Sequence, residues 1–186
     1  MEYSCEEVLQ QIQRLWDWHF TMRNFVHYQN GSNIGRINFG GIFKFHDRSL
    51  KYQYILDKPI DSQFNRDFNA IGHYLNQNVI IRLLGIIQDN KIVSKKQNVE
   101  PDYQGSKEVE LLLKLRNVIA HESGKFNPLI KEHCIIAKMQ MNVLGIDFDI
   151  ENATEFDLSI DKVIRPLFDG AKRYVTDFYR VRQQTE

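Results

Sequence analysis

The chain has 186 residues, of which 42% are hydrophobic and 26% are charged. This length suits one core with insertions, and the composition excludes a disordered or fibrous protein. Lys and Arg together equal Asp and Glu at 24 each, so any attraction to nucleic acid must come from local patches. Cys5 and Cys134 lack the density of a disulfide scaffold and the spacing of a CxxC motif, which predicts free thiols and a cytoplasmic location.

Neither a secretory signal nor a membrane segment is expected. The first residues, MEYSCEEVLQQ, lack the basic start and apolar core of a signal peptide. The longest nearly uncharged apolar run, residues 78–87, is too short to span a bilayer and contains Arg82. We therefore expect no membrane partner.

The first predicted elements are a helix and a β-hairpin. Apolar residues recur at helical intervals over residues 4–28, and Asn30-Gly31 follows them. The segment 30–58 contains glycines and then two alternating runs joined by a polar turn, which is typical of a hairpin. We expect this hairpin to be an insertion.

Two helices with a loop between them are predicted next. A three-and-four spacing of apolar residues continues for nearly thirty residues after Pro59 and predicts the longest helix. Residues 89–106 are polar and show no lasting period, which predicts a flexible loop. A helix is then expected over 106–122, with Ser106 as its cap and Gly124 as a left-handed terminator.

The last third of the chain predicts two helices and a second hairpin. Asn127-Pro128 resembles a cap with a first-turn proline, and the residues that follow fit a helix ending at Gly145, although they also alternate as a strand would. Residues 146–158 alternate around a polar turn and predict a small hairpin. Ser159 is expected to cap the last helix, which has the cleanest period in the chain.

The helix predicted over 106–122 carries an arginine and a histidine in its last turns. Asn117 and His121 are four residues apart and share a face, whereas Arg116 and His121 differ by about 140° around the axis and roughly 7.5 Å along it. A long Arg side chain can still turn toward the same opening. Helix physics also accounts for both, because a His there meets the negative end of the helix dipole and an Arg can lie along an apolar stripe.

The stretch LLLKLRNVIAHESG, residues 111–124, resembles the signature of the HEPN superfamily, in which an Arg and a polar residue precede a His near the end of a core helix. A Gly after the His, a short hairpin ending in Leu-Ser and a final amphipathic helix extend the resemblance over residues 105–182. The resemblance implies a mainly α fold in one domain, residues 1–186. The periodicity along the chain itself predicts a bundle of four to five helices with one or two small β-hairpin insertions, and the resemblance makes this bundle HEPN-like.

The resemblance to HEPN implies a metal-independent endoribonuclease that uses no cofactor and acts as a homodimer. An imidazole can accept and donate a proton near neutral pH, as attack by the 2′-hydroxyl of RNA requires, and this role falls to His121. Arg116 would hold the scissile phosphate and Asn117 would orient the imidazole or the phosphate. The implied cellular role is a bacterial toxin or phage-defence effector with an antitoxin or other regulatory protein as partner.

Ser123 departs from one group of the HEPN superfamily. That group carries a Tyr two residues after the His, which a partner nucleotidyltransferase modifies. Ser123 occupies this place here, so the resemblance does not extend to that mode of control.

A second set of candidate RNA contacts is basic and lies outside this helix. Aromatic residues of the 30–58 segment interleave with basic ones, a composition that can stack bases and hold phosphates. A hairpin with one packed face and one solvated face has the same composition, and exposed loop lysines are common. The residues in question are Arg36, Lys44 and Arg48 of the hairpin and Lys95 and Lys96 of the loop.

No metal site is expected, and two other functions stay open. The remaining histidines show no ligand spacing with one another or with a cysteine. One alternative to the nuclease is a catalytically inactive HEPN-like module that binds RNA, nucleotide or protein. The other is a helical regulatory subunit in which Arg116 and His121 only end a helix.

Overall fold

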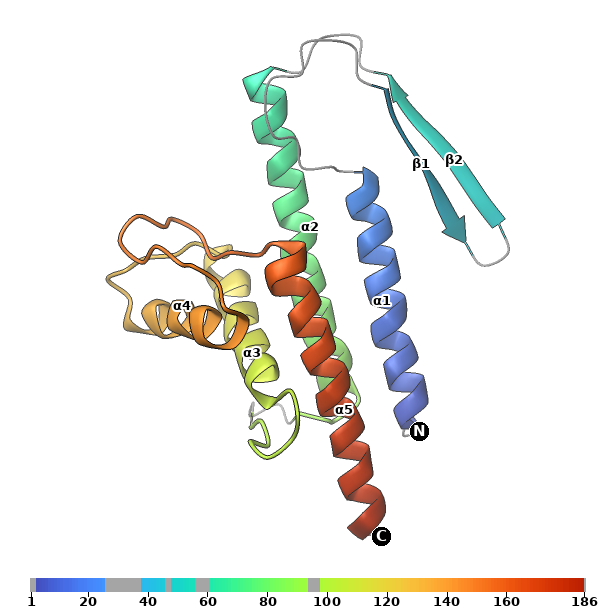
Figure 1. Ribbon diagram of the computed structural model, residues 1–186, viewed down its shortest axis with the longest axis vertical. Coiled ribbons are helices and arrows are strands. Elements are labelled where there is room, and N and C mark those ends of the chain that lie inside the picture. The colour runs from blue at the N-terminus through green and yellow to red at the C-terminus, as the bar shows by residue number, and fades with distance from the viewer. Residues whose placement is uncertain (1–2, 26–37, 46–47, 56–60, 94–97, 186) are drawn as a thin grey trace. The chain divides into compact units, whose positions relative to one another are not determined.

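The computed structural model describes the backbone of residues 3–25, 38–45, 48–55, 61–93 and 98–185. Helices account for most of these residues, so the prediction of a mainly helical bundle is confirmed (Figure 1). Within the described ranges no helix is long and apolar enough to cross a membrane. The helices are α1 (Cys5–Phe25), α2 (Ser62–Asp89), α3 (Ser106–Glu122), α4 (Lys131–Leu144) and α5 (Arg165–Thr185).

The chain divides into two compact units, and α1 and α2 each contribute to both. One unit is Asp17–Leu75, and the other combines Met1–Trp16 with Asn76–Glu186. The Asp17–Leu75 unit holds two antiparallel strands, β1 (Asn38–Phe45) and β2 (Arg48–Ile55), inside the segment where the sequence predicts a hairpin.

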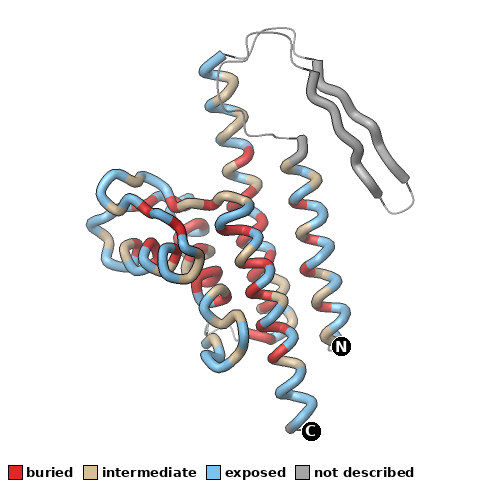
Figure 2. The backbone as a smooth tube through the Cα atoms, viewed as in Figure 1, coloured by how far each residue is buried: buried red, intermediate tan, exposed pale blue. Residues whose placement is uncertain are grey.

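The core of the larger unit is built mainly on α3 and α5. Figure 2 shows buried residues concentrated along both helices. On α3 the leucine stripe of the sequence is fully buried, and α5 contributes its apolar face and packs against it. Each such side chain stabilises the fold by about 1.5–3 kcal/mol. The largest of these fully buried side chains are Leu111, Leu112, Leu115, Phe168 and Tyr174.

The start of α3 is set by a close approach to α5 rather than by a serine cap. Gly105 has a left-handed backbone with φ of 83°, and a methyl group added to it would collide with the carbonyl oxygen of Gly170. The Ser106 hydroxyl instead donates a hydrogen bond to the Pro101 carbonyl at 3.0 Å. The predicted Ser106 cap is therefore wrong, because the chain enters α3 through a conformation that favours glycine.

The end of α3 is a double left-handed turn. Ser123 has φ of 55° and Gly124 has φ of 74°, and their N–H groups donate to the carbonyls of Ile119 and Val118. This pattern satisfies the last helical carbonyls. The predicted terminator at Gly124 is confirmed, and so is the predicted range of the helix, 106–122.

The loop between α2 and α3 is present where the sequence predicts it, although residues 94–97 lie outside the described residues. Its described part is bound to α5. The Glu100 N–H donates to the Tyr174 hydroxyl at 2.7 Å, and the Gln104 N–H donates to the Asp177 carboxylate at 2.9 Å. Burial of Tyr174 also raises the pKa of its phenol.

The segment before α4 differs from its prediction in one respect. The residues after Asn127-Pro128 form a helix and not a strand, and it ends at Gly145 with φ of 65°, as expected. The helix begins at Lys131, however, because the Asn127 side chain accepts a hydrogen bond from the Leu129 N–H at 2.9 Å and forms a separate turn.

The small hairpin predicted over 146–158 is absent from this described segment. Its alternation reports burial correctly, since Phe148 and Phe156 are buried. Both rings, however, pack on the ring of Phe126, with centroid distances of 5.0 and 5.3 Å. A turn at Asp149 also interrupts the chain, where hydrogen bonds from Asn152 lower the pKa of the Asp149 carboxyl. The prediction is wrong because residues 146–158 do not pair with themselves.

The start of the last helix contains a π-helical turn, Ile160–Ile164, and not a serine cap. The Arg165 N–H donates to the Ile160 carbonyl, one residue further back than in an α-helix. Pro166 follows and has no N–H to continue the α-helical pattern. The predicted Ser159 cap is wrong, since the Ser159 side chain makes no capping hydrogen bond.

Candidate active site at the end of helix α3

Arg116 lies on the side of α3 that faces α2. It is half-buried, and its Nη2 donates a long hydrogen bond of 3.4 Å to the Gln88 side-chain oxygen. Among the side chains that the structure describes, no carboxylate pairs with Arg116. Most of its N–H donors therefore stay available to an anion.

His121 is exposed in the last turn of α3. The imidazole has no hydrogen bond or ion pair with any residue of the described ranges. Asn117, one turn earlier on the same face, is half-buried. The structure thus brings Asn117 and His121 together on one face and directs Arg116 toward α2.

Two contacts hold the end of α3 in place. Buried Gln77 of α2 donates from its side-chain Nε2 to the Ser123 carbonyl at 2.7 Å. Since Gln77 meets the end of α3 and Gln88 meets Arg116, α2 and α3 run antiparallel here. The buried side-chain amide of Gln77 therefore holds the turn that follows His121.

The second contact joins Glu122 to His133 of α4. The Glu122 carboxylate lies 3.1 Å from Nε2 of His133, which is 1% exposed, in a geometry that is electrostatic rather than an aligned hydrogen bond. His133 Nδ1 accepts the Asn127 N–H at 3.0 Å, so a neutral ring carries its proton on Nε2, toward the carboxylate. No spacing within the sequence predicts this pair, because the two residues lie on different helices.

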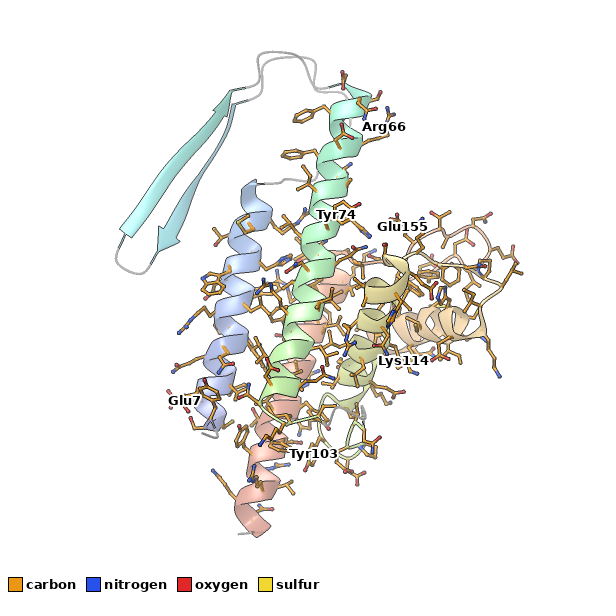
Figure 3. The ribbon with its side chains drawn as sticks, turned by 180° about the vertical axis from the view of Figure 1, so that it is seen from behind. Glu7, Arg66, Tyr74, Tyr103, Lys114 and Glu155 are labelled. Atoms are coloured by element: carbon orange, nitrogen blue, oxygen red, sulfur yellow. The ribbon has the colours of Figure 1, made fainter. Side chains whose placement is uncertain are left out.

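A hollow opens directly beyond His121. Its volume is about 600 Å³, and it lies between the end of α3 and the turn that precedes Glu155. Figure 3 shows Glu155 beside this end of α3, in agreement with the single bridge between Lys125 and Glu155. The hollow is lined by Glu122, Ser123, Lys125, Phe126, Asn127, Pro128, Ile130, Ala153 and Thr154.

A second hollow, of about 480 Å³, separates α1 from α5 in the same unit. Its charged groups are already engaged: Lys172 donates to Gln13 at 2.7 Å, and Asp177 pairs with Arg180 at 3.0 Å. Arg173 likewise pairs with Glu108 at 2.7 Å. These contacts show that the charged side chains of this hollow stabilise the packing of the helices around it.

Of the other predicted RNA contacts, the structure describes two, and these only by their backbone. Arg36, Lys95 and Lys96 lie outside the described residues. Lys44 lies on β1 and Arg48 on β2, and of these two strands the structure describes the backbone alone.

Comparisons with known proteins give no assignment. No protein-family model, curated protein or solved structure matches the chain. In the part of the chain with described side chains, no three His, Cys, Asp or Glu residues gather as a metal site would require. The candidate functional residues are those at the end of α3.

Proposed function

We propose that this chain is a metal-independent endoribonuclease of the HEPN type, with its active site at Arg116, Asn117 and His121. The observation that carries the proposal is the exposed imidazole of His121, which has no partner among the described residues although it ends a buried core helix. Buried His133 differs, since it accepts the Asn127 N–H and lies beside the Glu122 carboxylate.

The proposed reaction is attack of an RNA 2′-hydroxyl on the adjacent phosphorus. His121 takes the proton of the 2′-hydroxyl or gives one to the leaving 5′-oxygen, and Arg116 stabilises the negative charge that develops on the phosphate. Asn117 shares the His121 face and orients the imidazole or the phosphate. The products would carry a 2′,3′-cyclic phosphate and a 5′-hydroxyl.

One protomer would supply half of this site. In the dimer the phosphate would lie between His121 of one protomer and His121 of its partner, and Arg116 would reach it from the side of α3 that faces α2. The proposal therefore includes a homodimer formed through the exposed face of α3. In the cell, such an enzyme would act as a toxin or phage-defence effector restrained by a regulatory protein.

A second candidate function is a HEPN-like RNA-binding module without catalysis. The hydrogen bond from Arg116 to Gln88 favours it, because it engages the guanidinium with α2. Binding of RNA without cleavage would be its signature.

Cleavage of total RNA in the presence of a chelator tests the proposal. The parent protein should cut RNA, and both His121→Ala and Arg116→Ala should lower the rate by about 10²–10⁴-fold. Lys107→Ala, an exposed change at the other end of α3, serves as the control and should cleave like the parent. Melting temperatures of all variants should agree within about 3 °C, since these side chains are not in the core.

Two results would overturn the proposal. One is equal cleavage by His121→Ala and the parent, and the other is products that carry a 3′-hydroxyl. A protein that stays monomeric at high concentration would remove the composite site.

A further inference from the structure

The hollow beyond His121 has the features of a nucleobase pocket. It begins at Glu122, the next residue after His121, so the hollow and the proposed catalytic histidine lie at the same end of α3. Its volume of about 600 Å³ is of the size of small-ligand pockets.

The inner wall of the pocket is apolar and firmly supported. Phe126 is 6% exposed and is backed by the rings of Phe148 and Phe156, which meet it edge to face at 5.0 and 5.3 Å. Ile130 and Ala153 add to this wall. Such a surface can cover the face of a flat base, as aromatic and apolar side chains do for unpaired bases in RNA.

The rim of the pocket carries one fixed carboxylate and one available cation. The Glu122 carboxylate lies 3.1 Å from Nε2 of buried His133 without an aligned hydrogen bond, so both of its oxygens keep the capacity to accept hydrogen bonds from a ligand. Lys125 is exposed and has no ion pair with any described residue. A carboxylate only accepts hydrogen bonds, whereas an ammonium suits a phosphate.

These groups select among the bases. Guanine is the base whose Watson–Crick edge places two donors, N1–H and the 2-amino group, side by side, and this edge matches a carboxylate. Adenine and cytosine present one amino group next to an acceptor, which a carboxylate would repel. We propose that this pocket binds guanine, through Glu122 and with Lys125 on the adjoining phosphate, and so sets the base specificity of cleavage. The effect on cleavage rests on the nuclease function proposed above.

Binding of mononucleotides tests the pocket independently of cleavage. NMR titration of the full chain with GMP, AMP, CMP and UMP should give at least about tenfold tighter binding of GMP, with shifts at residues 122–130 and 153–154. Glu122→Gln should remove this preference, because an amide presents a donor as well as an acceptor. Lys125→Gln should weaken all four nucleotides alike and keep their order.

Glu132→Gln is the matched control, an exposed glutamate of α4 whose partner is Lys114 and which does not line the pocket. It should bind like the parent. A melting curve for Glu122→Gln within a few degrees of the parent shows that its effect is local, and Lys125→Gln gives a second measure that does not depend on the His133 contact.

Cleavage of RNA oligonucleotides then tests whether the pocket recognises guanine within an RNA chain as well as in a free nucleotide. Oligonucleotides that differ at the base beside the cut should be cleaved fastest with guanine, and Glu122→Gln should reduce this preference about tenfold. Equal binding of the four mononucleotides, or binding of none, would overturn the pocket and leave the cleavage test with His121→Ala unaffected. Selective GMP binding without any RNA cleavage would support the pocket and refute the nuclease.

Discussion

The two ends of α3 are built in opposite ways. At the start, Gly105 lies against the backbone of Gly170, and Glu108 pairs with Arg173 of α5 at 2.7 Å. At the end, Arg116 has only a long contact to Gln88, and His121 is exposed. The same leucine stripe connects the two ends.

This difference separates the parts of one helix by role. Groups that stabilise the fold are buried or paired within the protomer, as at the start of α3. Groups that act on a ligand must keep donors or acceptors that are not used within the protomer, which lowers stability. Such groups lie at the end of α3. Changes to Gly105 at the start should therefore alter unfolding, and changes to Arg116 or His121 at the end should alter activity.

The largest effect on stability is expected from Gly105→Ala. The left-handed backbone costs about 1–2 kcal/mol for a residue with a side chain, and the collision with the Gly170 carbonyl adds about 1–3 kcal/mol. Gly145→Ala is the control, because Gly145 also has a positive φ but an added methyl group there meets nothing. Urea denaturation should give a clearly larger loss for Gly105→Ala, and equal losses would contradict the close approach.

A smaller effect is expected at the opposite end from Gln77→Leu. The change removes the 2.7 Å hydrogen bond to the Ser123 carbonyl and should lower the free energy of unfolding by about 1–3 kcal/mol. Gln88→Leu removes the 3.4 Å bond to Arg116, at a half-buried position, and should cost less. The same denaturation series measures both, and a larger loss for Gln88→Leu would show that the buried amide does not hold the turn.

The smallest effect is expected between the two ends, from Lys114→Gln. Lys114 pairs with Glu132 of α4 at 3.3 Å, and the glutamate side chain is 61% exposed, so water and salt screen the pair (Figure 3 labels Lys114). The loss in unfolding free energy should stay below about 1 kcal/mol and vanish in 1 M salt. Lys107→Gln makes the same charge change without an ion pair among the described residues. A salt-resistant loss would mean that the pair is buried.

The sequence predicted the helical parts of the fold because their signals are local. The leucine stripe and Gly124 define α3, and both ends of the predicted range agree with the structure. The alternation over 146–158 reported which side chains are buried, but strand pairing depends on a distant partner, and the single bridge forms between Lys125 and Glu155. A local pattern cannot reveal such pairing.

The candidate site was predicted in part for the same reason. The position of Asn117 and His121 on one face follows from their spacing alone. The partners of the site, Gln77, Gln88 and His133, lie on α2 and α4, and no spacing within the sequence connects them to α3. The catalytic roles stay predictions until cleavage is measured.

The contact between Gly105 and Gly170 fixes the position at which α3 begins. Sixteen residues of helix, about 24 Å, separate Gly105 from His121. One residue inserted between them would swing the imidazole by about 100° and advance it by about 1.5 Å, while the glycine junction stayed where it is. The length of α3 therefore determines the direction in which the His121 side chain points. The helix should tolerate substitutions far more readily than insertions or deletions.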